Sequence, residues 1–381
     1  MKMTNQLFLL LTLFMFSCCK SSISILKNTQ LQPSLKEAFE EKFYIGTALN
    51  LSQIYGKNKK ASAIIDQQFN AVTAENCMKA IYLQPREGEF DFKDADRFVE
   101  FGEKRGIHVI GHTLIWHSQA PAWFFKDKNG HDVSKDVLIE RMHRHIHTVV
   151  SRYKGRVKGW DVVNEAIKDD GSWRQSKFYQ IIGEDFVRLA FKFAHEADPD
   201  AELYYNDYSM FLKGRRERVL KMVRNLKNQG VRVDGIGMQG HLGLNYPTVT
   251  DFETSLLAFS QLGVQVLVTE MDITVLPSPN GLMGAEVSRN FKYDEQLNPY
   301  NNGLPKNKET ALTQRYKDFF ALFLKHQDKI SRVTIWGVGD ANSWKNDWPV
   351  EGRTDYPLLF DRNYNPKPVV REIIEMAKKT K

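Results

Sequence analysis

The chain has 381 residues, of which 42% are hydrophobic and 26% are charged, as in a globular protein with a large core. Its formal net charge is +7, but we find no basic run, zinc-ligand spacing or RNA-binding motif, so nucleic acid is not an expected partner. Two of the three cysteines precede the folded part, and the remaining one, Cys77, cannot form an intramolecular disulfide alone.

The first residues predict an exported protein. Lys2 precedes an apolar stretch at 7–16, which is long enough for a signal peptide and too short to span a bilayer. Ser17 and Cys18 then resemble a bacterial lipobox, with Cys18 as the lipidated residue. We therefore expect a signal peptide at 1–18, a tether at 19–35, and a lipoprotein of the periplasm or cell surface that contacts the membrane only through its anchor. An ordinary cleaved signal and a secreted protein are the alternative.

From residue 43 onward, strand-like apolar runs alternate with helical patterns. Eight such runs occur, at 43–49, 71–75, 108–116, 157–164, 202–206, 235–241, 265–273 and 332–338. Eight strands, each followed by a helix, predict a (β/α)8 TIM barrel of the α/β class at 36–381, as one domain. We also expect a monomer. The segment 277–309 follows the seventh strand and is rich in Pro, Gly, Asn and Tyr, so we expect an insertion on the active face.

Two glutamates each end an apolar run: Glu165 ends WDVVNE and Glu270 ends VLVTE. Side chains at the carboxyl ends of barrel strands carry catalysis, so this pair could supply the acid and the nucleophile of a glycosidase. Asp272 points the same way as Glu270, and two like charges do not easily share a dry site. His241 on the previous strand could reach between them and hold Glu270. The alternative, in which Asp272 caps a helix and His241 is a core histidine, is equally compatible with the sequence.

Other side chains indicate a sugar site rather than a metal site. Asn164 precedes Glu165 and could hydrogen-bond a sugar hydroxyl. His143 and His147 have the spacing of a zinc pair, but no acidic base lies between them, so we expect surface histidines, no metal and no cofactor. Aromatic residues that could stack on sugar rings gather near strand ends: Trp116, Trp123, Tyr205, Tyr208, Trp336, Trp344 and Trp348.

A series of motifs occupies the expected strand ends in order along the chain. They are FNAVTAEN (69–76) with MK (78–79), GHTLIWHSQ (111–119), WDVVNEA (160–166), YNDY (205–208), GMQGH (237–241), VTEMDI (268–273), WGVGD (336–340), SW (343–344) and PLLFD (357–361). Over residues 40–378 the chain resembles glycoside hydrolase family 10, the endo-β-1,4-xylanases.

The resemblance implies endo-acting hydrolysis of β-1,4-xylosidic linkages in xylan by a retaining double displacement, with Glu165 as acid/base and Glu270 as nucleophile. It implies that His241 and Asp272 form a hydrogen-bonded pair that tunes Glu270. Implied substrate contacts are Asn164, His112, Trp116, Gln239, Trp336 and Trp344 around the sugar to be cleaved; Glu75, Asn76, Lys79 and Gln119 for neighbouring xylose units on the non-reducing side; and Tyr208 as a leaving-side platform.

Three other functions stay open. A retaining glycanase for mannan or cellulose could share the two glutamates, but it would lack the set formed by Glu75, Asn76 and Lys79 with His112–Gln119. A non-catalytic xylan-binding lipoprotein would most readily arise by loss of a glutamate, and both are present. A metal-dependent barrel hydrolase needs a ligand cluster that strand parity argues against. The chain departs from the family pattern at Ala80, where the family usually has Trp, and in the long 277–309 insertion, which bears on the leaving-side subsites.

Overall fold

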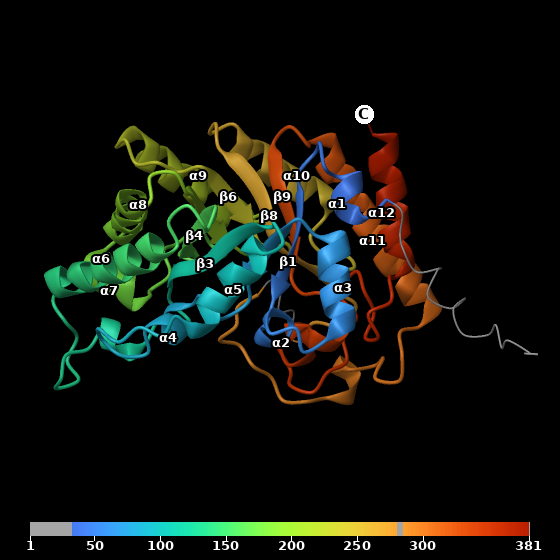
Figure 1. Ribbon diagram of the computed structural model, residues 1–381, viewed down its shortest axis with the longest axis horizontal. Helices are drawn as coiled ribbons and strands as arrows, with labels where there is room; N and C mark the ends of the chain where they lie inside the picture. Colours follow the sequence, from blue (N-terminus) through green and yellow to red (C-terminus); the bar gives the residue numbers. More distant parts are fainter. Residues whose placement is uncertain (1–32, 280–284, 381) are drawn as a thin grey trace, which may run out of the picture. The chain divides into compact units, whose positions relative to one another are not determined.

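A computed structural model describes residues 33–279 and 285–380, and a closed barrel of eight parallel strands forms the centre of this part of the chain (Figure 1). Neighbouring strands pair in the order β1–β2–β3–β4–β5–β6–β8–β9, and β9 pairs with β1 to close the barrel. In a parallel barrel, helices cover the outer face of each strand and the barrel core covers the inner face. Both faces are therefore buried, and the strand sequences are near-continuous hydrophobic runs. The strands are β1 (Tyr44–Leu49), β2 (Ala71–Ala74), β3 (His108–Trp116), β4 (Gly159–Asn164), β5 (Glu202–Asp207), β6 (Gly235–Met238), β8 (Gln265–Thr274) and β9 (Ile330–Ile335), with a short β7 (His241–Gly243) that pairs with β8.

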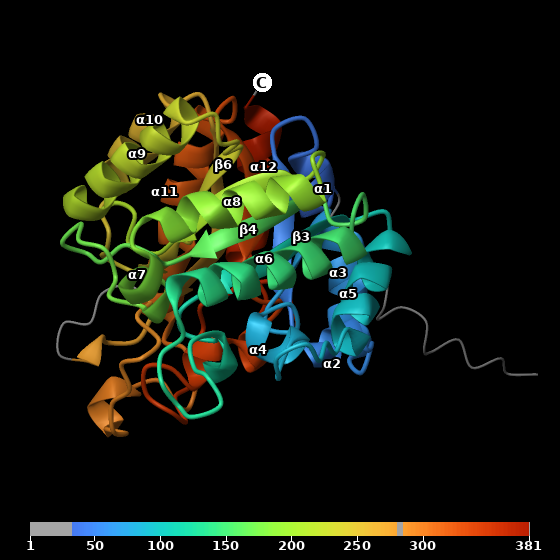
Figure 2. The same ribbon diagram turned by 90° about the vertical axis from the view of Figure 1, so that its left-hand side faces the viewer.

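Helices connect successive strands and cover the outside of the barrel (Figure 2). In α8, Phe186, Val187, Ala190 and Ala194 recur at helical spacing and are buried, so one face packs inward. α6 lies beside α8 and begins after Ser134, whose side chain accepts a hydrogen bond from the Val137 amide. The helices are α1 (Leu35–Ala38), α2 (Leu51–Ile54), α3 (Lys59–Gln68), α4 (Ala80–Leu83), α5 (Lys93–Glu103), α6 (Lys135–Arg152), α7 (Lys177–Ile182), α8 (Asp185–Ala197), α9 (Lys213–Asn228), α10 (Val249–Ser260), α11 (Lys306–Lys325) and α12 (Pro368–Lys379).

Large aromatic side chains pack between neighbouring strands because glycines on those strands leave room for them. Trp160 on β4 lies against Gly111 on β3, where an added Cβ atom would be 2.1 Å from the indole ring. Tyr204 on β5 lies against Gly159 on β4, where a Cβ atom would be 2.5 Å from the phenol oxygen. Both aromatic side chains are essentially fully buried, so these glycines are required by close packing.

The eight predicted strands and the TIM barrel are confirmed. β3 has the predicted bounds, most other strands differ by one or two residues at an end, and the largest differences are in the sixth and eighth runs. The sixth run divides at Gly240 into β6 and β7, because this residue has a φ of 83° and interrupts the extended backbone. The eighth run ends at Ile335, and Trp336 follows the strand. α11 begins at Lys306, so the irregular connection is shorter than the predicted 277–309 segment.

The folded part begins slightly earlier than residue 36. Ser34 forms a capping box with Glu37 at the start of α1, and the Leu35 amide donates to Gln68 Oε1 at 2.9 Å. Residues 34 and 35 therefore pack onto the barrel, although the tether was predicted to extend to residue 35. The predicted signal peptide, Cys18 and most of the tether lie outside the described residues. Within the described part, we find no helix with the length and apolarity needed to cross a membrane.

The loops and short helices that follow the strands lie at one end of the barrel. α2, α4 and the orange part of the insertion lie together at the lower end in Figure 1. In a parallel barrel the carboxyl ends of all strands share this end, so the residues that follow β4 and those late in β8 converge there. The predicted insertion therefore lies on the same face as Glu165.

Candidate active site

Glu165 lies immediately after β4 and has an unusual backbone conformation. Its φ is 60°, in the left-handed region that residues other than glycine rarely adopt. Its amide donates to the Asn206 carbonyl at 2.9 Å, and its own carbonyl accepts from Arg174 Nε at 2.9 Å. Because both of its backbone polar groups are bonded, the surrounding structure can maintain this conformation.

Three donors surround the carboxylate of Glu165. Trp116 Nε1 donates to Oε2 at 2.8 Å, and Gln239 Nε2 and Asn164 Nδ2 donate to Oε1 at 3.0 and 3.3 Å. Burial raises the pKa of Glu165 to about 7; the negative charges of Asp207 and Glu270 add to this effect, and the hydrogen bonds oppose it. A carboxyl group with this pKa is protonated below neutral pH and can act as a general acid.

Glu270 lies within β8, two residues past the part of the strand that pairs with β6, and remains ionised. Its Oε1 accepts from Asn206 Nδ2 at 2.7 Å, and its Oε2 lies 3.3 Å from His241 Nε2. Burial opposes ionisation of Glu270, but the hydrogen bond from His241, the electrostatic influence of His112 and His241, and the bond from Asn206 hold its pKa below the usual value. The pKa values of the two glutamates are therefore moved in opposite directions.

His241 bridges Glu270 and Asp272, which is one of the two arrangements that the sequence left open. The other ring nitrogen, Nδ1, lies 3.0 Å from Asp272 Oδ2. Asp272 also accepts from Trp344 Nε1 at 2.7 Å, and its Oδ1 lies 3.9 Å from Lys345 Nζ. Although burial works against protonation, the charge of Asp272 and the hydrogen bonds to both carboxylates raise the pKa of His241. The helix-cap alternative for Asp272 is thus not what the structure shows.

Both glutamates line one cavity of about 210 Å³. Two residues of the insertion, Ala285 and Val287, form part of its wall. The remaining wall residues come from β3, β4, the segment after β2, the loop after β3, the β6–β7 junction and the segment after β9: Glu75, Asn76, Lys79, His112, Trp116, Gln119, Asn164, Gln239, His241, Trp336 and Trp344. Among the predicted catalytic and substrate-binding residues, the structure thus brings together all except Asp272, which lies behind His241, and Tyr208.

Lys79 is buried beside the aromatic wall of this cavity. Its Nζ donates to Asn76 Oδ1 at 2.9 Å and lies 4.8 Å from the centre of the Trp116 ring. Burial lowers the pKa of Lys79, and the charges of Glu75 and the two catalytic candidates oppose that effect. The polar groups at this end of the cavity are therefore positioned before any ligand binds.

Tyr208 does not lie on the cavity wall, contrary to the platform prediction. It is 3% exposed, and its ring faces the Arg215 guanidinium at 4.1 Å. Its hydroxyl accepts from Arg174 Nη2 at 2.8 Å and donates to Glu286 Oε2 at 3.1 Å. The buried ring therefore offers no exposed face to a sugar: Arg215 covers one face, and Arg174 and Glu286 bond the hydroxyl.

The sequence interpretation also left out Asn206. Its amide donates both to Glu270 Oε1 and, at 3.0 Å, to Asn164 Oδ1, so it connects the two catalytic strands. Asn206 lies near the end of β5, as Asn164 does on β4, and that position was the available signal. Trp123 and Tyr205, in contrast, use their polar atoms within the fold, on the Gln84 carbonyl and on Asp207 Oδ2.

No metal site is evident among residues 33–279 and 285–380. We find no group of three or more His, Cys, Asp or Glu side chains there that could hold a metal ion. His143 and His147 are exposed, with ring centres 5.7 Å apart, as expected for surface histidines.

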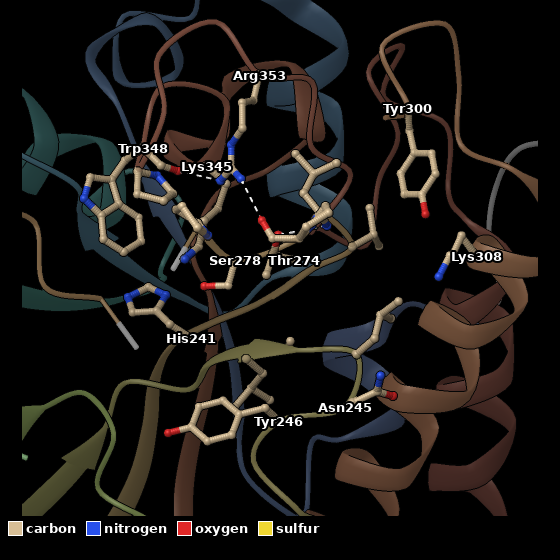
Figure 3. A pocket seen from close by; sticks show the side chains of 18 residues that line it. His241, Asn245, Tyr246, Thr274, Ser278, Tyr300, Lys308, Lys345, Trp348 and Arg353 are labelled. Carbon is tan, nitrogen blue, oxygen red and sulfur yellow. Dashed lines mark hydrogen bonds between the residues drawn. The ribbon is translucent and has the colours of Figure 1, made fainter. Parts of the chain in front are cut away.

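A second cavity of about 400 Å³ borders the first and shares His241 with it (Figure 3). Its walls come from the segment around β7, the residues after β8 and the segment 345–353, with Tyr300 and Lys308 on the opposite side (Figure 3). Lys345 lines this cavity, with its Nζ 4.3 and 4.7 Å from the centres of the Trp344 and Trp348 rings. The larger cavity lacks both glutamates, so the smaller one is the candidate active site.

Comparison with known proteins points to one family. The model of glycosyl hydrolase family 10 matches residues 34–376. The chain is 53% identical over 347 residues to endo-1,4-beta-xylanase A of Xylanibacter ruminicola, covering 91% of this chain and 94% of that protein. It is 40% identical over 352 residues to an endo-1,4-beta-xylanase of Geobacillus stearothermophilus, covering 90% and 98%.

Solved structures give the same result. A GH10 endoxylanase retrieved from sugarcane soil metagenome superposes with a TM-score of 0.88 at 47% identity, covering 90% of this chain and all of that one. Xylanase XynB from Paenibacillus barcinonensis, solved with a conduramine derivative, superposes with a TM-score of 0.81 at 38% identity, covering 90% and 98%.

Proposed function

Because the chain belongs to glycosyl hydrolase family 10 and is an endo-1,4-β-xylanase, we propose that it cleaves xylan by a retaining double displacement. One observation carries the mechanism: Glu165 and Glu270 line one cavity, and the pKa of the first is raised while that of the second is lowered. Two carboxyl groups tuned in opposite directions are the acid and nucleophile that such a mechanism requires.

In the first step, the Glu270 carboxylate attacks the anomeric carbon, and the bond from that carbon to the glycosidic oxygen breaks. Glu165 gives its proton to the departing oxygen, which leaves as the hydroxyl of the released chain. The three groups that contact the Glu165 carboxylate are all donors, so its own proton remains available for the substrate oxygen in the cavity. The product is a xylosyl ester of Glu270.

In the second step, water attacks the anomeric carbon and Glu270 departs as a carboxylate. Glu165, now ionised, removes the proton of that water and so returns to its starting state. Esterification removes the charge of Glu270, which lowers the pKa of Glu165 and suits it to act as a base. Contacts from His241 and Asn206 favour the ionised form of Glu270 and so make it a better leaving group.

We assign sugar contacts by position around the cavity. Glu75, Asn76, Lys79 and Gln119 would hold xylose units on the non-reducing side, and the wall near the two glutamates would surround the sugar that is cleaved. In that wall, His112 is fixed by Asp161, 2.8 Å from its Nδ1, and packs edge-on to Trp336. Fixed polar and aromatic groups of this kind orient a sugar without the cost of ordering flexible side chains.

The location of the protein is also a proposal. We expect lipidation at Cys18 to anchor the monomer to a bacterial membrane, because an apolar stretch and a lipobox-like sequence precede this residue. Incorporation of labelled palmitate should be lost in Cys18→Ala. Incorporation that is equal in both proteins, or absent from both, would refute this assignment.

The catalytic roles can be separated with two variants and two classes of substrate. Glu165→Ala should retain turnover of aryl xylobiosides with good leaving groups, lose turnover of xylan, and be rescued by azide, which needs no general base. Glu270→Ala should be inactive on both. Equal loss on both substrates in Glu165→Ala, with no effect of azide, would contradict the roles. Release of reducing sugars from xylan, mannan and cellulose tests the substrate class.

A further inference from the structure

The insertion reaches the active site through a small polar cluster, which consists of Glu286, Arg174, Tyr208 and Ser288. Glu286 lies between Ala285 and Val287, the two insertion residues that line the catalytic cavity. Its own carboxylate turns to Arg174, and Oε2 accepts from Nη1 at 2.6 Å. Tyr208 also donates to Oε2, and Ser288 Oγ donates to Oε1 at 2.8 Å. The side chain of Glu286 thus fastens this part of the insertion to the loop after β4.

Arg174 connects Glu286 to the general acid, because it bonds both Glu286 and the backbone of Glu165. Its three nitrogens are divided: Nη1 bonds Glu286, Nη2 bonds Tyr208, and Nε donates to the carbonyl of Glu165 at 2.9 Å. The Arg174 amide also donates to the Ala166 carbonyl at 2.8 Å, which brings the loop back beside the end of β4. A planar guanidinium holds several partners in fixed directions, so moving Glu286 would reorient the donor to Glu165.

This contact matters because of the backbone of Glu165. Its φ of 60° is intrinsically unfavourable for a side chain with a Cβ atom, and it persists only where neighbouring groups enforce it. The peptide group before Glu165 is held by Asn206 on the barrel. In the peptide group after it, the Ala166 amide donates to the Tyr205 hydroxyl at 3.2 Å and the Glu165 carbonyl accepts from Arg174 on a loop. The loop contact is the one that depends on a residue of the insertion.

The cluster differs from an ordinary surface ion pair. The side chains of Arg174 and Glu286 are only 13% and 21% exposed, whereas an exposed pair contributes little. Burial opposes ionisation of Glu286, but hydrogen bonds and charge from Arg174, with the bonds from Ser288 and Tyr208, lower its pKa to about 2. Glu286 therefore keeps its charge over the whole range in which the enzyme would be assayed.

We propose that Glu286 and Arg174 are positioning residues of the hydrolytic reaction: Glu286 fixes the insertion as a wall of the catalytic cavity, and through Arg174 it holds Glu165 in the orientation needed to protonate the leaving oxygen. The inference rests on the proposed acid/base role of Glu165. The insertion then has a specific role: Ala285 and Val287 line the catalytic cavity, and Glu286 between them bonds Arg174.

Leaving-group dependence separates this role from a merely structural one. An aryl xylobioside with a good leaving group, such as dinitrophenyl, needs little protonation, whereas xylan and a phenyl xylobioside need it fully. In Glu286→Ala, Glu165 should lose its orientation, so kcat/KM for the phenyl xylobioside should fall by about 10- to 100-fold. For the dinitrophenyl xylobioside, kcat/KM should change by less than about threefold. The alkaline limb of the pH profile should also move to lower pH, because a loosened wall admits water and burial is the main cause of the raised pKa of Glu165.

Two further variants and a control complete the test. Arg174→Lys keeps a cation for Glu286 but removes the Nε donor to Glu165, so it should show the same selective loss. Glu286→Gln keeps an oxygen acceptor for Arg174 and should lose less than Glu286→Ala. Glu309→Gln removes an exposed ion pair with Lys306, in which the nitrogen and oxygen are 2.6 Å apart. It should leave kcat/KM unchanged for both substrates.

The outcome is read as the ratio of the two kcat/KM values in each variant, with folding checked by thermal unfolding. Equal losses on both substrates, or no loss on either, would overturn the proposal. If Glu286→Ala is unfolded at the assay temperature, the proposal is tested by the same ratio of kcat/KM values in Glu286→Gln and Arg174→Lys. Failure of the proposed function is distinct, because the unmodified enzyme would then release no reducing sugar from xylan.

Discussion

The raised pKa of Glu165 has a consequence for stability that can be measured without substrate. Its folded-state value of about 7 lies above the ordinary 4.5, and each pH unit corresponds to about 1.4 kcal/mol, so the ionised form is disfavoured by about 3 kcal/mol in the folded protein. Between about pH 5 and 7 the unfolded chain has released this proton and the folded protein has not. The contribution of Glu165 to the free energy of unfolding is therefore fully present in acid and is lost as pH rises.

Glu165→Gln removes this titration while keeping the shape of the side chain. We expect wild type to lose about 2–3 kcal/mol of unfolding free energy relative to Glu165→Gln between about pH 5 and pH 8, because the amide cannot ionise. Urea unfolding at a series of pH values measures the difference directly. Any fixed cost of placing an amide among three donors shifts the whole curve and cancels from its pH dependence.

Glu270→Gln is the matched control, with the opposite sign. The pKa of Glu270 is lowered in the folded protein, so its contribution to stability is present above the unfolded-state pKa and is lost as pH falls through the folded value. The variant should be less stable than wild type at neutral pH and approach it in acid. A difference between wild type and Glu165→Gln that stays constant from pH 5 to 8 would refute the reasoning.

Three further predictions follow from the same structure. The kcat/KM of wild type should fall above an apparent pKa near 7, because the free enzyme must hold the Glu165 proton; a rate that stays constant to pH 9 would contradict this. Asp272→Asn should lower the pKa of His241 and so raise that of Glu270, which moves the acid limb of kcat/KM to higher pH; an unmoved limb would show that Asp272 does not act through His241. Gly111→Ala should lower the free energy of unfolding by about 1–3 kcal/mol, because the new methyl group would overlap Trp160. Gly243→Ala, where the nearest atom would be 3.8 Å from the new methyl group, should change it little. Equal effects of the two variants in urea unfolding would refute the packing argument.

Much of the fold could be predicted because a parallel barrel imposes a strong local pattern. Strands covered on both faces need hydrophobic runs, and eight runs separated by helical spacing leave few alternatives. The placement of Glu165 and Glu270 followed from the same pattern, since the carboxyl ends of the strands share one face. Strand parity even indicated the link between His241 and Asp272, because a period of two is a local property of the chain.

Predictions failed where the outcome depended on segments far apart in the sequence. The family resemblance implies that Tyr208 is a leaving-side sugar platform, but contacts with Arg215, Arg174 and Glu286 bury it. The role of Asn206 was missed for a similar reason: an amide near a strand end can face solvent, the backbone or a carboxylate, and only the neighbouring strands decide which.

The sequence by itself determined the barrel, the family and the two glutamates, because each is expressed in residue types at short, regular spacing. The tertiary structure decided how the glutamates differ. Glu165 has a raised pKa because burial and two neighbouring carboxylates disfavour its charge, while Glu270 is held ionised against burial by His241 and Asn206. It also decided that the insertion returns to the acid through Glu286 and Arg174. These properties depend on distances between side chains from separate strands and loops, which no local pattern encodes.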